Sequence, residues 1–147
     1  MAENDRRNAV NDWSEAKKRH TTDCSSYVSF AMQRVKLVPK NTGFYLQDGV
    51  LKGEHRKRIT KNNKLKVYEH VNQPIKSLVK SGKVVPGDIV GPSSGAHTMI
   101  YVKHKNGRYY FHSVNGPVGQ ILKPSSVLNN TFRQGGNYRI GAIIHPK

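Results

Sequence analysis

The chain has 147 residues, with 25 Lys and Arg against 9 Asp and Glu, which gives a net charge of +16. This length suits one hydrophobic core, so we expect a single domain over residues 1–147. The charge is typical of a protein that meets a polyanion, although a solubilising surface would give the same count. No stretch approaches the ~18 apolar residues of a membrane span. The charged first residues are unlike a secretory signal peptide, and one cysteine excludes an internal disulfide.

Two amphipathic helices are predicted near the N-terminus. The first spans Asp5–Lys18, where apolar residues recur at helical spacing. The second begins near Cys24, after Thr22 or Asp23, either of which can cap the first turn through its side-chain oxygen. It ends before Pro39, because a proline disfavours helical backbone at the residue that precedes it.

The rest of the chain predicts a loop, a short helix and then strands. The basic segment Asn41–Lys64 is weakly periodic and is interpreted as a long surface excursion. Pro74 suits the first turn of a short helix that Gly82 ends. The predicted strands are short, β-branched or aromatic, and bounded by Gly, Pro or Asn: Asp88–Val90, His97–Val102, Tyr109–Val114 and Ile140–Ile144. Helices followed by strands indicate an α+β fold with a small antiparallel sheet.

Cys24 is a candidate nucleophile because of its place at the start of the second helix. A thiol attacks as the thiolate, and a helix N-terminus together with a nearby imidazolium lowers the thiol pKa. The small polar neighbours Ser25 and Ser26 leave room for a substrate and expose backbone N–H groups that can serve an oxyanion. The alternative is a buried cysteine that acts as a small hydrophobic residue, and periodicity does not reject it.

Four short segments, taken in order, resemble the NlpC-type cell-wall cysteine peptidases, relatives of the CHAP amidases. These segments are Asp23-Cys24-Ser25, Pro86-Gly87-Asp88-Ile89-Val90, His97-Thr98-Met99-Ile100-Tyr101-Val102 and Phe111-His112-Ser113. The resemblance spans about Trp13 to Ser113 and implies a papain-like fold, with N-terminal helices packed on the sheet. Ser26 stands where the family usually has Gly. The segment before the cysteine lacks the family's tyrosine, so the residue that completes the oxyanion hole stays unassigned.

The resemblance also implies a role for each candidate site residue. Cys24 is the nucleophile, His97 takes its proton and later protonates the leaving amine, and His112 fixes the tautomer and orientation of His97. Asp23 and Ser25 match family positions that contact the free amine end of a stem peptide. Neither a cofactor nor a metal is expected.

Strand alternation sets a geometric condition on the two histidines. A two-residue turn at Asn106-Gly107 would pair His112 with Tyr101 and leave His97 ~13 Å away along the strand. A longer loop would pair His112 with Met99 and bring His97 to a diagonal position ~7 Å away. We therefore expect a longer loop or a β-bulge in this hairpin.

The substrate predicted from the resemblance is the peptide part of bacterial peptidoglycan, with anionic wall polymers attracted by charge. An extracellular or cell-wall location and a monomer follow, and the scarcity of aromatic residues in the basic block disfavours nucleic acid. The same site could instead serve an acyltransferase, a deamidase or a toxin domain. A non-catalytic polyanion binder is another alternative. A zinc site built from His20, Cys24, His97, His104 and His112 is a third, although it lacks paired Cys-x-x-Cys spacing.

Overall fold

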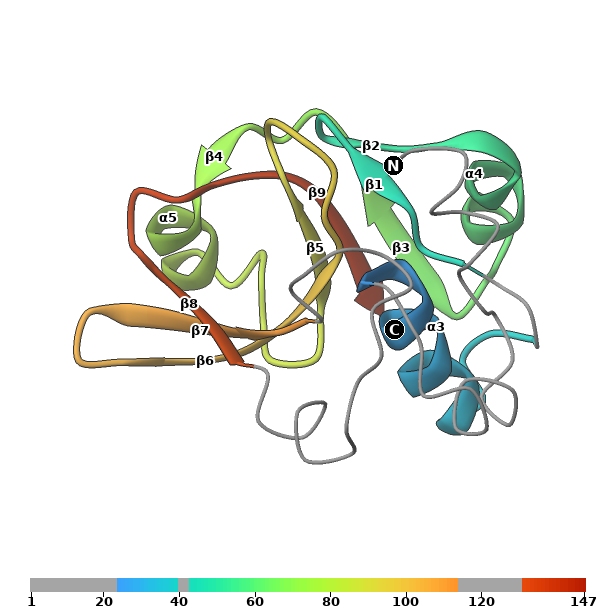
Figure 1. Ribbon diagram of the computed structural model, residues 1–147, viewed down its shortest axis with the longest axis horizontal. Coiled ribbons are helices and arrows are strands. Elements are labelled where there is room, and N and C mark those ends of the chain that lie inside the picture. Colours follow the sequence, from blue (N-terminus) through green and yellow to red (C-terminus); the bar gives the residue numbers. More distant parts are fainter. Residues whose placement is uncertain (1–23, 40–42, 114–130) are drawn as a thin grey trace.

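The computed structural model describes residues 24–39, 43–113 and 131–147. Its centre is a seven-stranded antiparallel sheet in the order β3-β9-β5-β6-β7-β8, with β4 paired to β9 and a separate β1–β2 hairpin (Figure 1). The helices are α3 (Cys24–Arg34), α4 (Gly53–Thr60) and α5 (Ile75–Lys80). The strands are β1 (Leu46–Gln47), β2 (Val50–Leu51), β3 (Leu65–Tyr68), β4 (Gln73–Pro74), β5 (Ile89–Pro92), β6 (Met99–Lys105), β7 (Arg108–His112), β8 (Thr131–Gly135) and β9 (Arg139–Pro146). The fold is thus mixed, with strands outweighing helices.

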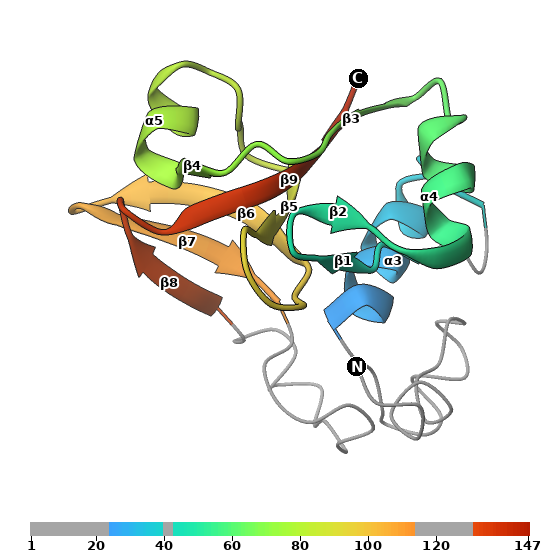
Figure 2. The same cartoon turned by 90° about the horizontal axis from the view of Figure 1, so that it is seen from above.

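The sheet carries a hydrophobic cluster on each face because its strands alternate in side-chain direction. Ile89 and Ile144 belong to the cluster that α3 and the β1–β2 hairpin cover. Their neighbours Val90 and Ile143 belong to the cluster that α5 covers. In Figure 2, α3 and α4 lie at one side of the molecule, whereas the β6–β7 hairpin extends away from them.

Helix α3 and helix α5 agree with the sequence prediction. Helix α3 begins at Cys24 and ends at Arg34, before Pro39, and it buries Val28 and Met32 in the core. Helix α5 follows Pro74 and buries Ile75 and Leu78, and Gly82 lies just beyond it with a positive φ of 77°. The predicted helix Asp5–Lys18 lies outside the described residues.

The prediction of a surface excursion over Asn41–Lys64 is wrong. The segment forms β1, β2 and α4, and it buries Phe44, Leu46, Leu51 and Ile59 in the core under α3. Its apolar residues are few and separated by charged ones, so their alternation was not recognised. The strands β3 and β8 were also missed, since Leu65–Tyr68 and Thr131–Gly135 mix polar and apolar residues.

A tight turn at Asp48-Gly49 lets the β1–β2 hairpin rest on the sheet. Both residues have positive φ, 50° and 80°, as a two-residue hairpin turn requires. The backbone of Gly49 lies so close to β9 that a Cβ built on Gly141 would be 2.5 Å from the Gly49 Cα. The absence of side chains here allows the hairpin to pack against β9 and β5.

In the part of the chain that the structure describes, none of the helices has the length and apolar character needed to cross a membrane.

Candidate functional site

The β6–β7 hairpin contains both features that the sequence argument weighed as alternatives to each other. Asn106 and Gly107 form a tight turn, with φ of 53° and 74°, and Lys105 pairs with Arg108. The register then shifts between Tyr101 and Lys103, so a β-bulge is present. The expectation of a bulge is confirmed, and the longer loop is not formed.

The bulge changes the partner of His112. With the extra residue in β6, His112 lies opposite Ile100, so the predicted pairing with Met99 is wrong. The physical reason is that a bulge adds one residue to one strand only and shifts every later pair by one. Continuing the same register places Ser113 opposite Met99, in the position predicted for His112. Ser113 is therefore the residue diagonal to His97.

His97 immediately precedes β6, and its side chain contacts Ser113. The His97 Nε2 atom lies 3.2 Å from the Ser113 Oγ atom, and Ser113 is fully buried. The predicted orienting contact of His97 thus falls to Ser113 rather than to His112. Sequence reasoning missed Ser113, although the quoted triplet Phe111-His112-Ser113 contains it.

The segment before β6 is tied to the β1–β2 hairpin. The buried Thr98 hydroxyl donates to the carbonyl oxygen of Phe44 at 2.6 Å, and the Gly95 N–H donates to the Asp48 carboxylate at 2.7 Å. Ala96 forms an isolated antiparallel bridge with Gln47. The segment that the sequence analysis took for a surface excursion therefore fixes the backbone on both sides of the candidate base.

His97 is largely buried, which has an electrostatic consequence. Burial lowers the pKa of the His97 imidazole below its ordinary value of 6.5, because a buried site disfavours the charged form. The ring is accordingly biased toward the neutral form, which can accept a proton. This is the state that a general base needs at neutral pH.

Cys24 provides the first backbone residue of α3, and α3 packs against β6. The helix that starts at the candidate nucleophile thus adjoins the strand that the candidate base precedes. The side chains of Cys24 and Ser25, and the whole of Asp23, lie outside what the structure describes. Their predicted roles as nucleophile and amine-binding residues therefore stay predictions.

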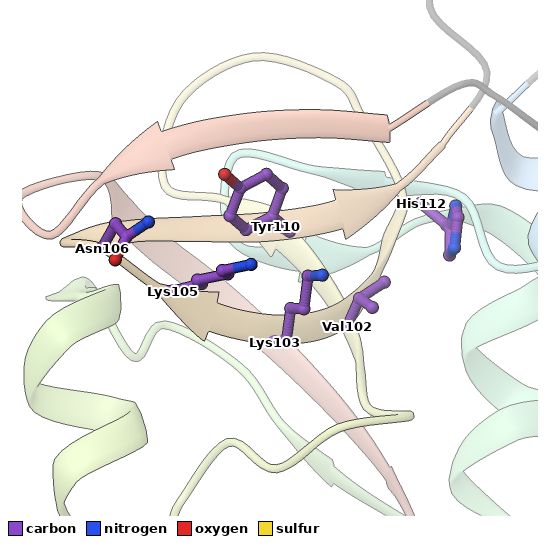
Figure 3. A pocket seen from close by; sticks show the side chains of 6 residues that line it. All are labelled: Val102, Lys103, Lys105, Asn106, Tyr110 and His112. Atoms are coloured by element: carbon purple, nitrogen blue, oxygen red, sulfur yellow. The ribbon is translucent and has the colours of Figure 1, made fainter.

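His112 occupies a different environment from His97. Its Nδ1 atom is buried and makes no hydrogen bond within residues 24–39, 43–113 and 131–147. The residue lines the inner end of a pocket of about 470 Å³ along the hairpin. Figure 3 shows this pocket running from His112 to Asn106 at the turn. Its lining residues are Val102, Lys103, Lys105, Asn106, Tyr110 and His112.

The remaining histidines differ in what they contact. His104 stacks on Tyr109, with ring centroids 4.2 Å apart. The His145 Nδ1 atom lies 2.6 Å from the buried Asp88 carboxylate, a pair that the sequence analysis did not foresee. Burial raises the pKa of Asp88 above its ordinary value, while the hydrogen bond from the Val85 N–H and the contact with His145 lower it.

The zinc alternative receives no geometric support from the described residues. Among them, three or more His, Cys, Asp or Glu side chains do not gather as a metal site requires. His20 and the Cys24 side chain, which that alternative also needs, lie outside the described part.

Comparisons with protein-family models, with curated proteins and with solved structures give no match for this chain.

Proposed function

We propose that the protein is a papain-like cysteine hydrolase that cleaves amide bonds in the stem peptides of bacterial peptidoglycan. Cys24 is the nucleophile, His97 is the base, and Ser113 orients the imidazole. The observation that carries the proposal is the arrangement around β6. The helix that begins at Cys24 packs against this strand, and the buried His97 immediately precedes it in contact with Ser113.

The choice of nitrogen atoms follows from the His97–Ser113 contact. Since Nε2 faces the Ser113 hydroxyl, Nδ1 is the nitrogen that serves the thiol. The Ser113 oxygen accepts from Nε2–H and thereby selects the tautomer with a lone pair on Nδ1. This oxygen would also accept from the imidazolium that forms during the reaction.

The reaction then proceeds in two balanced steps. His97 Nδ1 takes the thiol proton, the sulfur of Cys24 bonds to the carbonyl carbon, and the C–N bond breaks as the imidazolium gives its proton to the leaving amine. Water next attacks the thioester carbon while His97 takes one of its protons. The C–S bond breaks, and the proton returns to the sulfur. The backbone N–H groups at the start of α3 are the proposed donors to the oxyanion.

The stem-peptide substrate depends on the resemblance of the four segments to the NlpC-type peptidases. Asp23 and Ser25 are proposed to receive the free amine of the peptide, as the matching positions do in that family. A net charge of +16 suits a protein that works at an anionic wall. An extracellular or wall location, action as a monomer and independence of any cofactor belong to the same proposal.

Digestion of purified sacculi tests the proposal. The wild-type protein should release soluble peptides whose masses identify the cleaved bond, and Cys24→Ala should release none. His104→Ala is a suitable control, because it removes an exposed imidazole that stacks on Tyr109 outside the proposed site. Sacculi that stay intact with wild-type protein while thiol-dependent hydrolysis of other amides is detected would reassign the substrate. Undiminished lysis by Cys24→Ala would overturn the mechanism.

A further inference from the structure

A positively charged strip lies on the outer part of the β6–β7–β8 sheet. We call it the hairpin strip and define it as Lys103, Lys105, Arg108, Tyr110 and Arg133. The strand register places these residues on one face, because residues directly opposite in an antiparallel pair point the same way. Lys103 and Arg133 lie opposite Tyr110 from either side, and Lys105 lies opposite Arg108.

The cations of the strip are exposed and have no acidic neighbour on their strands. Lys103, Lys105, Arg108 and Arg133 are all solvent-exposed. No Asp or Glu follows Asp88 in the sequence, so β6, β7 and β8 carry none. Elsewhere acidic side chains do meet partners, as Glu69 meets Arg56 at 2.7 Å. The positive charge of the strip is therefore not compensated within its own strands.

The strip is spread out rather than convergent. Neighbouring strands are ~4.8 Å apart, and successive residues on one face of a strand are ~6.7 Å apart. Its cations thus lie in rows across three strands, which suits repeated negative charges better than a single carboxylate. The inner end of the hairpin pocket is His112, next in the chain to the Ser113 that contacts His97 (Figure 3).

The aromatic residue of the strip already has a cation on its face. The Lys103 ammonium group lies 5.4 Å from the centroid of the Tyr110 ring. A nucleobase that stacked on this ring would have to displace that cation–π contact, and readers of single-stranded nucleic acid depend on such stacking. The strip therefore offers charge for a backbone of phosphates rather than a stacking platform for bases.

We propose that the hairpin strip binds a linear phosphodiester polymer without bases, of the polyol-phosphate type, and so holds the catalytic end of the hairpin at the wall. The inference deepens the proposed function, since it names the wall component that positions the site next to its peptide substrate. The polymer lies along β6 and β7 and leaves the surroundings of His97 to the peptide.

Binding of purified Cys24→Ala protein to fluorescent poly(glycerol phosphate) tests the inference separately from catalysis, because this variant needs no turnover. Anisotropy titrations would compare Lys103→Gln/Lys105→Gln with Lys61→Gln/Lys66→Gln, both in that background. The two changes remove equal charge. Each also removes one cation–π contact, because the Lys66 ammonium lies 5.3 Å from the Tyr68 ring centroid on the other half of the molecule.

The strip variant should weaken binding by ~tenfold and lower the salt dependence, whereas the control should change it by less than ~threefold. Thermal melting of each variant verifies that it is folded. Equal losses in both variants would mean that net charge alone attracts the polymer and would overturn the inference. Equally tight binding of poly-γ-glutamate or of a single-stranded oligonucleotide would overturn the phosphate or the base-free assignment, respectively.

Discussion

The two ends of the β6–β7 hairpin share their strands but place their polar residues in opposite environments. At the inner end, His97 and Ser113 are withdrawn from water, and burial lowers the pKa of the imidazole. At the outer end, the hairpin strip leaves its cations in solvent. Desolvation sharpens proton chemistry between two or three groups, whereas exposed charges act over longer distances and are screened by salt. The comparison indicates that inner substitutions should alter turnover and outer ones should alter attachment.

Two reagents give the largest expected difference between the ends. Iodoacetamide should abolish hydrolysis by alkylating the only cysteine, Cys24, while a chelator should leave hydrolysis intact, because a thiol and an imidazole need no ion. Neither reagent should change polymer binding at the hairpin strip. Hydrolysis assays and mass spectrometry of the alkylated protein measure this. Loss of hydrolysis with the chelator, together with protection of Cys24 by bound zinc, would favour the metal alternative.

Substitution of the two histidines should separate base from neighbour. His97→Ala removes the proton acceptor and should lower kcat by ~10²–10⁴-fold, the usual contribution of a general base. His112→Ala should cost less, about tenfold or below, because the structure gives the contact with His97 Nε2 to Ser113. Turnover of both variants on one soluble stem peptide checks this order. A silent His97→Ala would refute the assignment of the base.

The order of the strands was predictable from the sequence, whereas the pairing of the site residues was not. Short β-branched runs marked β5, β6, β7 and β9 well. The sequence contains no equally clear mark for the bulge near Val102, and this one residue moves Ser113 into the place predicted for His112. The orienting residue of the site thus depended on a detail that periodicity does not report.

The β1–β2 hairpin shows a signal that was present but not used. Asp48-Gly49 between Leu46 and Val50 is a strong hairpin pattern, equal in kind to Asn106-Gly107. The charged stretch that follows masked it, because α4 buries little more than Ile59 and so lacks an apolar stripe. Low hydrophobicity was mistaken for exposure, although a few well-placed apolar residues suffice to anchor a short element.

Ser113→Ala tests the inner end more finely. Loss of one neutral hydrogen bond costs about 1 kcal/mol, so kcat should fall by roughly fivefold to tenfold. Ser113→Thr keeps the hydroxyl and should restore part of the rate if the buried site accepts the added methyl group. Because Ser113 acts through His97, the acid limb of the pH–rate profile should move in the Ala variant. A proportionate loss of folded protein with an unchanged pH profile would indicate a purely structural role.

The smallest expected effect is a pH dependence of stability that arises at the inner end alone. The folded-state pKa of His97 lies below the unfolded value of 6.5, so above pH 6.5 both states are neutral and the site carries no penalty. As the pH falls below 6.5, the unfolded chain takes up a proton that the folded chain does not. Stability is therefore lost until the folded-state pKa is reached, by about 1.4 kcal/mol for each unit that separates the two pKa values.

His97→Gln removes this titration and should flatten the decline, which urea titrations between pH 7 and pH 5 would measure as the difference between variant and wild type. Asp88 contributes with the opposite sign, because its pKa is raised in the folded state and protonation there relieves a buried charge. Taking the difference between variant and wild type cancels this term, which both proteins share. Lys103→Gln/Lys105→Gln should follow the wild-type curve, since exposed lysines do not titrate in this range. An equal flattening in the strip variant would show that overall charge repulsion, rather than the buried imidazole, sets the decline.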